Sequence, residues 1–174
     1  MTVPSPAKSA PPKANPVPAA SALYLREDEL RRGIELLYFG YTSLIRGPDE
    51  LLAEEGLGRA HHRALYFIAR KPGLAVGELL RLLAITKQSL GRVLNDLQAR
   101  DLVVQKIGTT DRRQRLLHLT PKGESLETAL FERLQTHMAA AYSEAGQNAV
   151  TGFWNVLMSL IPPSDRPLIN ALQK

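Results

Sequence analysis

Residues 74–97 read LAVGELLRLLAITKQSLGRVLNDL, and this stretch decides the fold of the chain. Its leucines and valines recur at every third or fourth position, which is the spacing of amphipathic helices. The pattern predicts one helix over residues 76–84 and a second over residues 87–100, joined by a turn at residues 84–86. Because so short a connection does not allow two helices to stack antiparallel, we expect the two helices to cross steeply.

The second helix of this pair has a polar and cationic face opposite its apolar one. The major groove of B-DNA admits an α-helix, and Gln, Ser, Asn and Arg side chains can read base edges there while Lys and Arg hold phosphates. Thr86 stands at the N-cap position, so the positive end of the helix dipole would point toward the nucleic acid. The candidate DNA-binding residues of this recognition helix are Thr86, Lys87, Gln88, Ser89, Arg92 and Asn95.

The next stretch, residues 103–121, reads VVQKIGTTDRRQRLLHLTP and predicts a β-hairpin with a cationic tip. A turn that projects beside a recognition helix reaches the adjacent minor groove, whose negative potential attracts arginine. Asp111 stands two residues before Arg113, where a charge-assisted hydrogen bond would orient the guanidinium. We therefore interpret the hairpin as a wing, with candidate DNA-binding residues Asp111, Arg112, Arg113 and Arg115.

The positive charge of the chain is concentrated on these two elements. The 174 residues carry a formal net charge of +5, and 44% of them are hydrophobic, enough for one core. Eight basic and three acidic residues between Lys87 and Lys122 give that stretch alone a charge of +5. A cationic hairpin by itself is typical of a solvated turn, and a helix pair by itself is a common packing unit. The helix pair followed directly by the cationic hairpin, together with the concentrated positive charge, favours a polyanionic partner.

Several other classes of function lack the residues that they require. The chain has no cysteine, which excludes disulfides and thiolate zinc sites. No apolar run is long enough to span a bilayer, and prolines occupy the N-terminus where a secretory signal needs an apolar region, so we expect a cytoplasmic protein. We find no catalytic triad, no paired carboxylates and no phosphate-binding loop, and we expect neither an enzyme nor a cofactor. His61 and His62 are adjacent and point about 100° apart on a helix, which makes a shared metal ion a minority interpretation.

Helical patterns flank the central region on both sides. The first 22 residues contain half of the twelve prolines and predict a disordered tail, either a solvated extension or a contact for DNA phosphates. A long amphipathic helix is predicted over residues 25–46, ended by Gly47-Pro48, with Asp49 capping a short helix that follows. Further helices are predicted over residues 59–70, from Pro121 to Gly146, over residues 150–161, and as a short turn after residue 164.

The segment from Leu57 to about Leu130 resembles the multiple-antibiotic-resistance regulator (MarR) family of dimeric winged helix-turn-helix repressors and activators. The resemblance lies in Glu78-Leu79, Leu82-Leu83, residues 85–90 with Arg92, residues 97–103, residues 111–113 and residues 117–123 (LHLTPKG). It implies that Asp111 and Arg113 reach the minor groove and that Lys87, Gln88, Ser89 and Arg92 contact bases and phosphates. This chain departs from the family pattern at Ala75, where Thr or Ser is usual, at Ala84, where Gly is frequent, and in its proline-rich tail and its Pro162-Pro163 ending.

The resemblance also implies an architecture and two further partners. We expect a mainly α fold with a small β-hairpin: a tail over residues 1–22, then one domain over 23–174, with a winged helix-turn-helix lobe over 57–122 and dimerisation helices over 23–56 and 123–174. The flanking helices would form a homodimer that binds two DNA half-sites as an inverted repeat, although they could instead fold back on their own lobe. A small aromatic or anionic effector would bind between stem and lobe. The candidates for that pocket are Tyr38, Tyr41, His61, His62 and Arg63, with ordinary core or interface packing as the alternative for the tyrosines.

These observations predict a ligand-responsive regulator of transcription that binds double-stranded DNA. The leading alternative is a protein-interaction or dimerisation module that uses the winged fold without reading DNA. An enzyme ranks third, because the chain has no room for a catalytic domain after the wing.

Overall fold

A computed structural model describes residues 20–108 and 113–172 of the chain. The chain forms two compact units, one ending at Gly40 and one extending from Tyr41 onward. The long helix α1 (Glu27–Glu54) begins in the first unit and ends in the second. Of the helices in the described ranges, none has the combination of length and apolarity needed to cross a bilayer.

The first unit contributes the N-terminal half of α1. Glu27, Asp28 and Glu29 occupy its first turn, where acidic side chains interact favourably with the helix dipole. Its apolar side chains are solvent-exposed, and they are Leu30, Ile34, Leu36, Leu37, Tyr38 and Phe39.

The predicted break of this helix at Gly47-Pro48 is wrong, because α1 continues through Pro48 to Glu54. Proline inside a helix removes one backbone hydrogen bond and usually kinks or ends the helix. Here Ile45, Pro48 and Leu52 are all buried and share one face of α1. Packing of that face outweighs the local cost of the proline, and Asp49 lies inside the helix rather than capping a new one.

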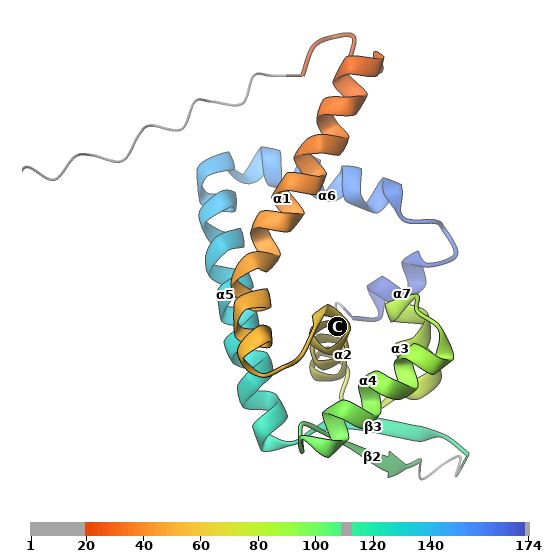
Figure 1. The fold of residues 1–174 in the computed structure, drawn as a ribbon. Coiled ribbons are helices and arrows are strands. Elements are labelled where there is room, and N and C mark those ends of the chain that lie inside the picture. The colour runs from red at the N-terminus through yellow and green to blue at the C-terminus, as the bar shows by residue number, and fades with distance from the viewer. Residues whose placement is uncertain (1–19, 109–112, 173–174) are drawn as a thin grey trace, which may run out of the picture. The chain divides into compact units, whose positions relative to one another are not determined.

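The second unit contains a winged helix-turn-helix lobe (Figure 1). Its elements are α2 (Arg59–Arg70), β1 (Leu74–Ala75), α3 (Val76–Leu83), α4 (Lys87–Ala99), β2 (Val103–Ile107) and β3 (Arg115–Leu119). The strands form an antiparallel sheet in the order β1-β3-β2. The predicted fold class, mainly helical with a small hairpin, is confirmed. The two-residue strand β1 was not predicted, because its pairing with β3 is not visible in a local pattern.

The core of the lobe is formed by leucines and other aliphatic residues from every one of its elements. Leu65 and Ile68 of α2 are fully buried against α3, α4 and β3. The other residues of this core that are at most 2% exposed are Leu52, Ala64, Leu74, Leu79, Leu83, Leu90, Leu97, Leu102, Val103, Leu117 and Leu130. The core therefore fixes the two crossing helices and the hairpin as one body.

In the described residues after the wing, the chain forms three more helices: α5 (Pro121–Ala145), α6 (Gln147–Leu160) and α7 (Arg166–Asn170). Thr120 caps α5 by accepting a hydrogen bond from the Gly123 amide at 3.0 Å, and Pro121 occupies the first turn, as predicted. No residue of α6 is buried, and Phe153, Trp154, Val156 and Leu160 are among its exposed side chains. An amphipathic helix with an exposed apolar face is incomplete without a further partner.

Candidate nucleic-acid interface

The turn between α3 and α4 sets the crossing of the two helices. Ala84 ends α3 in the left-handed conformation (φ 51°, ψ 43°), and its amide donates to the Leu80 carbonyl at 3.1 Å. The Arg63 guanidinium of α2 donates to the carbonyls of Leu83 at 2.9 Å and Leu82 at 3.3 Å. These carbonyls lie in the last turn of α3, where a cation also interacts favourably with the helix dipole. Arg63 thus holds the end of α3 at the start of the tight turn.

Thr86 is the N-cap of α4, as the sequence predicts. Its hydroxyl oxygen accepts a hydrogen bond from the Ser89 amide at 3.1 Å and donates to the Ser89 hydroxyl at 2.9 Å. A threonine cap of this kind is typically worth about 1 kcal/mol of helix stability.

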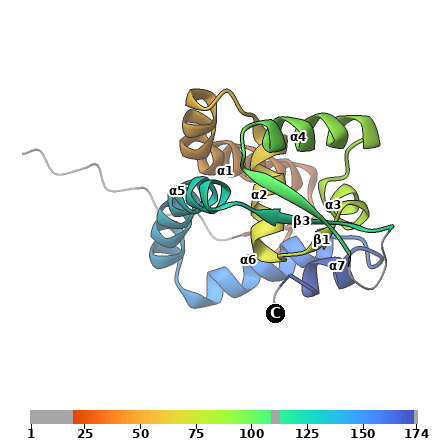
Figure 2. The same cartoon turned by 90° about the horizontal axis from the view of Figure 1, so that it is seen from below.

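The polar face of α4 lies at the surface. Leu90, Val93, Leu94 and Leu97 are buried on one side of the helix. The six candidate residues of the recognition helix are all exposed, and they are Thr86, Lys87, Gln88, Ser89, Arg92 and Asn95. In the view from below, α4 lies at the surface beside the β2–β3 hairpin (Figure 2). One surface therefore carries both elements that the sequence assigns to DNA.

The hairpin is regular up to its tip. Val103 pairs with Leu119 and Ile107 with Arg115, and the Gly108 amide donates to the Gln114 carbonyl at 3.1 Å. Arg113 and Arg115 are exposed. Asp111 and Arg112 lie outside the described residues, so the predicted bond between Asp111 and Arg113 stays a prediction.

Strand β1 brings the wing next to α3. Because Ala75 pairs with Leu116, the neighbouring Arg115 lies close to the first turn of α3. A groove of about 460 Å³ opens there, lined by residues 75–78, Arg81 and residues 113–115. Arg81 is exposed in this groove and was not among the predicted site residues. Only the unpredicted pairing of β1 with β3 places this cation beside the wing.

Among the described residues that line the groove, one side chain is acidic, and it is already engaged. Glu78 accepts a hydrogen bond from the Lys71 ammonium at 2.9 Å and reaches back to the Ala75 amide at 3.3 Å. Lys71 is the main cause that lowers the pKa of Glu78. Arg81 adds a weaker electrostatic attraction to the same carboxylate, so Glu78 is shared between Lys71, the Ala75 amide and Arg81.

The candidate effector residues are divided between two helices, the tyrosines on α1 and the other three on α2. His61 accepts a hydrogen bond from the Gly58 amide at Nδ1, and its Nε2 lies 3.3 Å from the Asp96 carboxylate of α4. His62 is half-buried, and burial lowers its pKa against the attraction of Asp49. Arg63 binds the carbonyls at the end of α3, as described above.

The two candidate tyrosines fall in different units of the chain. Tyr38 is exposed and belongs to the first unit, whereas Tyr41 is exposed in the second. Within residues 20–108 and 113–172, no three His, Asp or Glu side chains gather in a way that could hold a metal ion. The predicted effector pocket stays a prediction.

Comparison with known proteins points to one family. The family model described as the MarR family matches residues 55–114. The HTH-type transcriptional regulator PetP of Rhodobacter capsulatus is 46% identical over 144 residues, which cover 83% of this chain and 87% of that protein.

Two solved structures show the same fold at low sequence identity. Staphylococcus aureus MarR in complex with salicylate and kanamycin has a TM-score of 0.64 and 21% identity, covering 80% of this chain and 95% of that one. A mutant MarR from E. coli complexed with operator DNA has a TM-score of 0.61 and 20% identity, covering 82% of this chain and all of that one.

Proposed function

This chain belongs to the MarR family of transcription regulators, whose members are not enzymes, and from that premise we propose that it binds an inverted repeat in double-stranded DNA as a homodimer under the control of a small-molecule effector. In this proposal α4 enters the major groove and the wing reaches the adjacent minor groove. The protein acts in the cytoplasm, where its DNA is.

The observation that carries this proposal is the division of α4 into two faces. Its leucines and valine hold it in the lobe, while Gln88, Ser89 and Asn95 expose donors and acceptors that match base edges. Lys87 and Arg92 flank them with positive charge suited to phosphates. None of these five side chains is needed for the core, so their chemistry is available to a ligand.

The groove beside α3 extends the same surface toward the wing. Arg81 of α3 and Arg115 of β3 both line it, while the Glu78 carboxylate is hydrogen-bonded to Lys71 and the Ala75 amide. We assign these two arginines to the phosphates of the strand that separates the major groove from the minor groove. The operator complex of E. coli MarR supports the choice of DNA as the partner.

The homodimer and the effector rest on different features. Exposed apolar side chains on α1 and on α6 supply surfaces that a second copy of the chain can cover. A two-fold axis through such a dimer places two recognition helices on successive major grooves, which predicts half-sites about one helical turn apart. Structural neighbours in complex with salicylate and with 4-hydroxyphenylacetate support a small aromatic effector. Among the sequence-predicted candidates, we assign its pocket to those of the second unit, Tyr41, His61, His62 and Arg63.

The test begins with selection of bound fragments from a genomic pool, followed by a search of those fragments for an inverted repeat. The affinity for a selected fragment is then measured by fluorescence anisotropy over a range of salt concentrations. The log–log slope should be near −0.9 for each phosphate contact, with several contacts per lobe.

Three variants separate the assigned roles. Gln88→Ala should change which base is preferred, Arg113→Ala should weaken binding with loss of preference for A·T pairs, and Arg81→Ala should make the salt slope about 0.9 less steep. Failure to retain any DNA, with salt-insensitive binding to a protein instead, would favour an interaction module and refute the proposal.

A further inference from the structure

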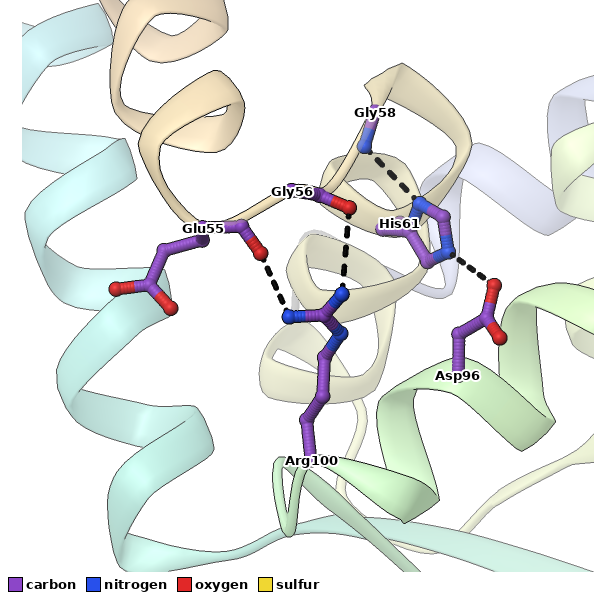
Figure 3. A network of polar contacts seen from close by, with 6 residues as sticks. All are labelled: Glu55, Gly56, Gly58, His61, Asp96 and Arg100. Atoms are coloured by element: carbon purple, nitrogen blue, oxygen red, sulfur yellow. Dashed lines mark hydrogen bonds and ion pairs between the residues drawn. The ribbon is translucent and has the colours of Figure 1, made fainter.

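The C-terminal end of α4 is tied by polar contacts to the turn between α1 and α2. The Arg100 guanidinium donates from Nη1 to the Glu55 carbonyl at 2.7 Å and from Nη2 to the Gly56 carbonyl at 3.4 Å (Figure 3). Gly56 adopts a left-handed conformation with φ 63°, and this turns both carbonyls of the α1–α2 turn toward α4. Arg100 thereby bridges two segments that are 44 and 45 residues apart in the chain.

A second contact joins the same two regions one turn earlier in α4. His61 accepts from the Gly58 amide through Nδ1, so the other ring nitrogen carries the hydrogen and donates to Asp96 at 3.3 Å (Figure 3). The side chain of His61 is 17% exposed, whereas that of Asp96 is 60% exposed. Asp96 and Arg100 are four residues apart and therefore share one face of α4.

The other side of this helix end is held by the start of α5. The Lys122 ammonium donates to the Arg100 carbonyl at 3.1 Å, and the Thr120 hydroxyl donates to the Asp101 carbonyl at 2.6 Å. The end of α4 is therefore fixed between α1–α2 on one side and α5 on the other.

These contacts lie at the opposite end of α4 from the residues assigned to the bases. With a rise of 1.5 Å per residue, Gln88 lies about 18 Å along the helix from Arg100. A tilt of about 5° at the fixed end would displace Gln88 by about 1.5 Å, beyond the distance range of a hydrogen bond. A small change in the direction of α4 at Arg100 therefore produces a large displacement of Gln88 at the other end of the helix.

We propose that Arg100 is a positioning residue that sets the direction of α4 in the major groove by bridging it to the α1–α2 turn, without touching DNA itself. This inference rests on the proposed function, because it needs α4 to read bases. Both terminal nitrogens of Arg100 donate to carbonyls, which turns the guanidinium toward the α1–α2 turn. The apolar packing of Leu90, Leu94 and Leu97 keeps α4 folded in its absence.

The test compares Arg100→Ala with wild type and with Arg92→Ala on two duplexes, a selected fragment and an unrelated sequence of equal length. For Arg100→Ala we expect roughly tenfold weaker binding to the selected fragment, since base contacts are lost. Binding to the unrelated duplex and the salt slope should stay as in wild type, because no phosphate contact is removed. Arg92→Ala should instead weaken both complexes and reduce the slope by about 0.9.

Three results would overturn the inference: wild-type affinity of Arg100→Ala for the selected fragment, a reduced salt slope, or equal weakening on both duplexes. If Arg100→Ala does not fold, Arg100→Lys serves instead, because its single ammonium can bridge to one carbonyl and keeps the charge. It should retain the slope and lose part of the discrimination between duplexes, and unchanged discrimination would count against Arg100. Absence of DNA binding by the wild-type protein would overturn the proposed function itself.

Discussion

A methyl group added at Gly123 tests the junction between the winged lobe and α5. An ideal Cβ at this position would lie 2.0 Å from the Leu102 carbonyl oxygen and 2.9 Å from its carbonyl carbon. Both partners are backbone in a buried corner, so α5 and the α4–β2 connection would have to separate by about 1 Å. That movement would break the bonds from the Thr120 amide to the Leu102 oxygen (3.1 Å) and from the Thr120 hydroxyl to the Asp101 oxygen (2.6 Å).

The expected loss follows from these contacts. Each broken hydrogen bond costs about 1 kcal/mol, overpacking adds about 1–3 kcal/mol, and the better helix propensity of alanine returns up to about 1 kcal/mol. Gly123→Ala should therefore lower the free energy of unfolding by about 2–4 kcal/mol and the Tm by roughly 5–15 °C. Urea unfolding followed by circular dichroism measures this change, at one fixed protein concentration because association affects stability.

The matched control is the same substitution where space is open. Gly91 lies within α4, and a Cβ there would meet nothing within 4 Å. Gly91→Ala should stabilise the free protein by about 0.5–1 kcal/mol. A loss below about 1 kcal/mol for Gly123→Ala, or equal effects of the two substitutions, would refute the argument from the close approach to Leu102.

Two further substitutions test the turn between α3 and α4 and the first turn of α2. Ala84→Gly should raise the free energy of unfolding by up to about 1 kcal/mol in urea titrations, because Ala84 is in the left-handed region where a Cβ is unfavourable. The control, Ala99→Gly within α4, should instead lower the free energy of unfolding. A lower free energy of unfolding for both variants would contradict this reason. Burial lowers the pKa of His62, so the unfolded chain binds a proton more readily than the folded one, and stability should fall as pH drops below about 6.5. His62→Gln should make stability less dependent on pH between 7 and 5, and an unchanged profile would show that His62 is not the group responsible.

Much of the fold follows from local patterns, because its helices have strong apolar periodicity and distinct ends. The predicted helix over residues 59–70 coincides with α2, and Thr120-Pro121 marks the start of α5 as expected. The polar face of α4 was also predictable, since 3.6-residue spacing separates Gln88 and Arg92 from the buried leucines.

The failures share one cause, which is that tertiary contacts override local preference. Pro48 reads as a helix end, yet its burial with Ile45 and Leu52 keeps α1 continuous. Strand β1 has two residues and no pattern of its own, so Arg81 could not be placed beside the wing. Likewise, the bridge from Arg100 to Glu55 and Gly56 joins segments that no local signal connects.

The pairing of Leu74 and Ala75 with Leu117 and Leu116 limits how the proposed effector control can act on the winged lobe. It attaches the hairpin to the segment that runs directly into α3, so the base of the wing and the helix pair are held by one sheet and one core. A hinge between the wing and the helix pair would have to break the β1–β3 hydrogen bonds and also open the leucine core. Under the proposed effector control, a mutation that alters the response should therefore lie where the winged lobe joins its flanking helices and not within the lobe.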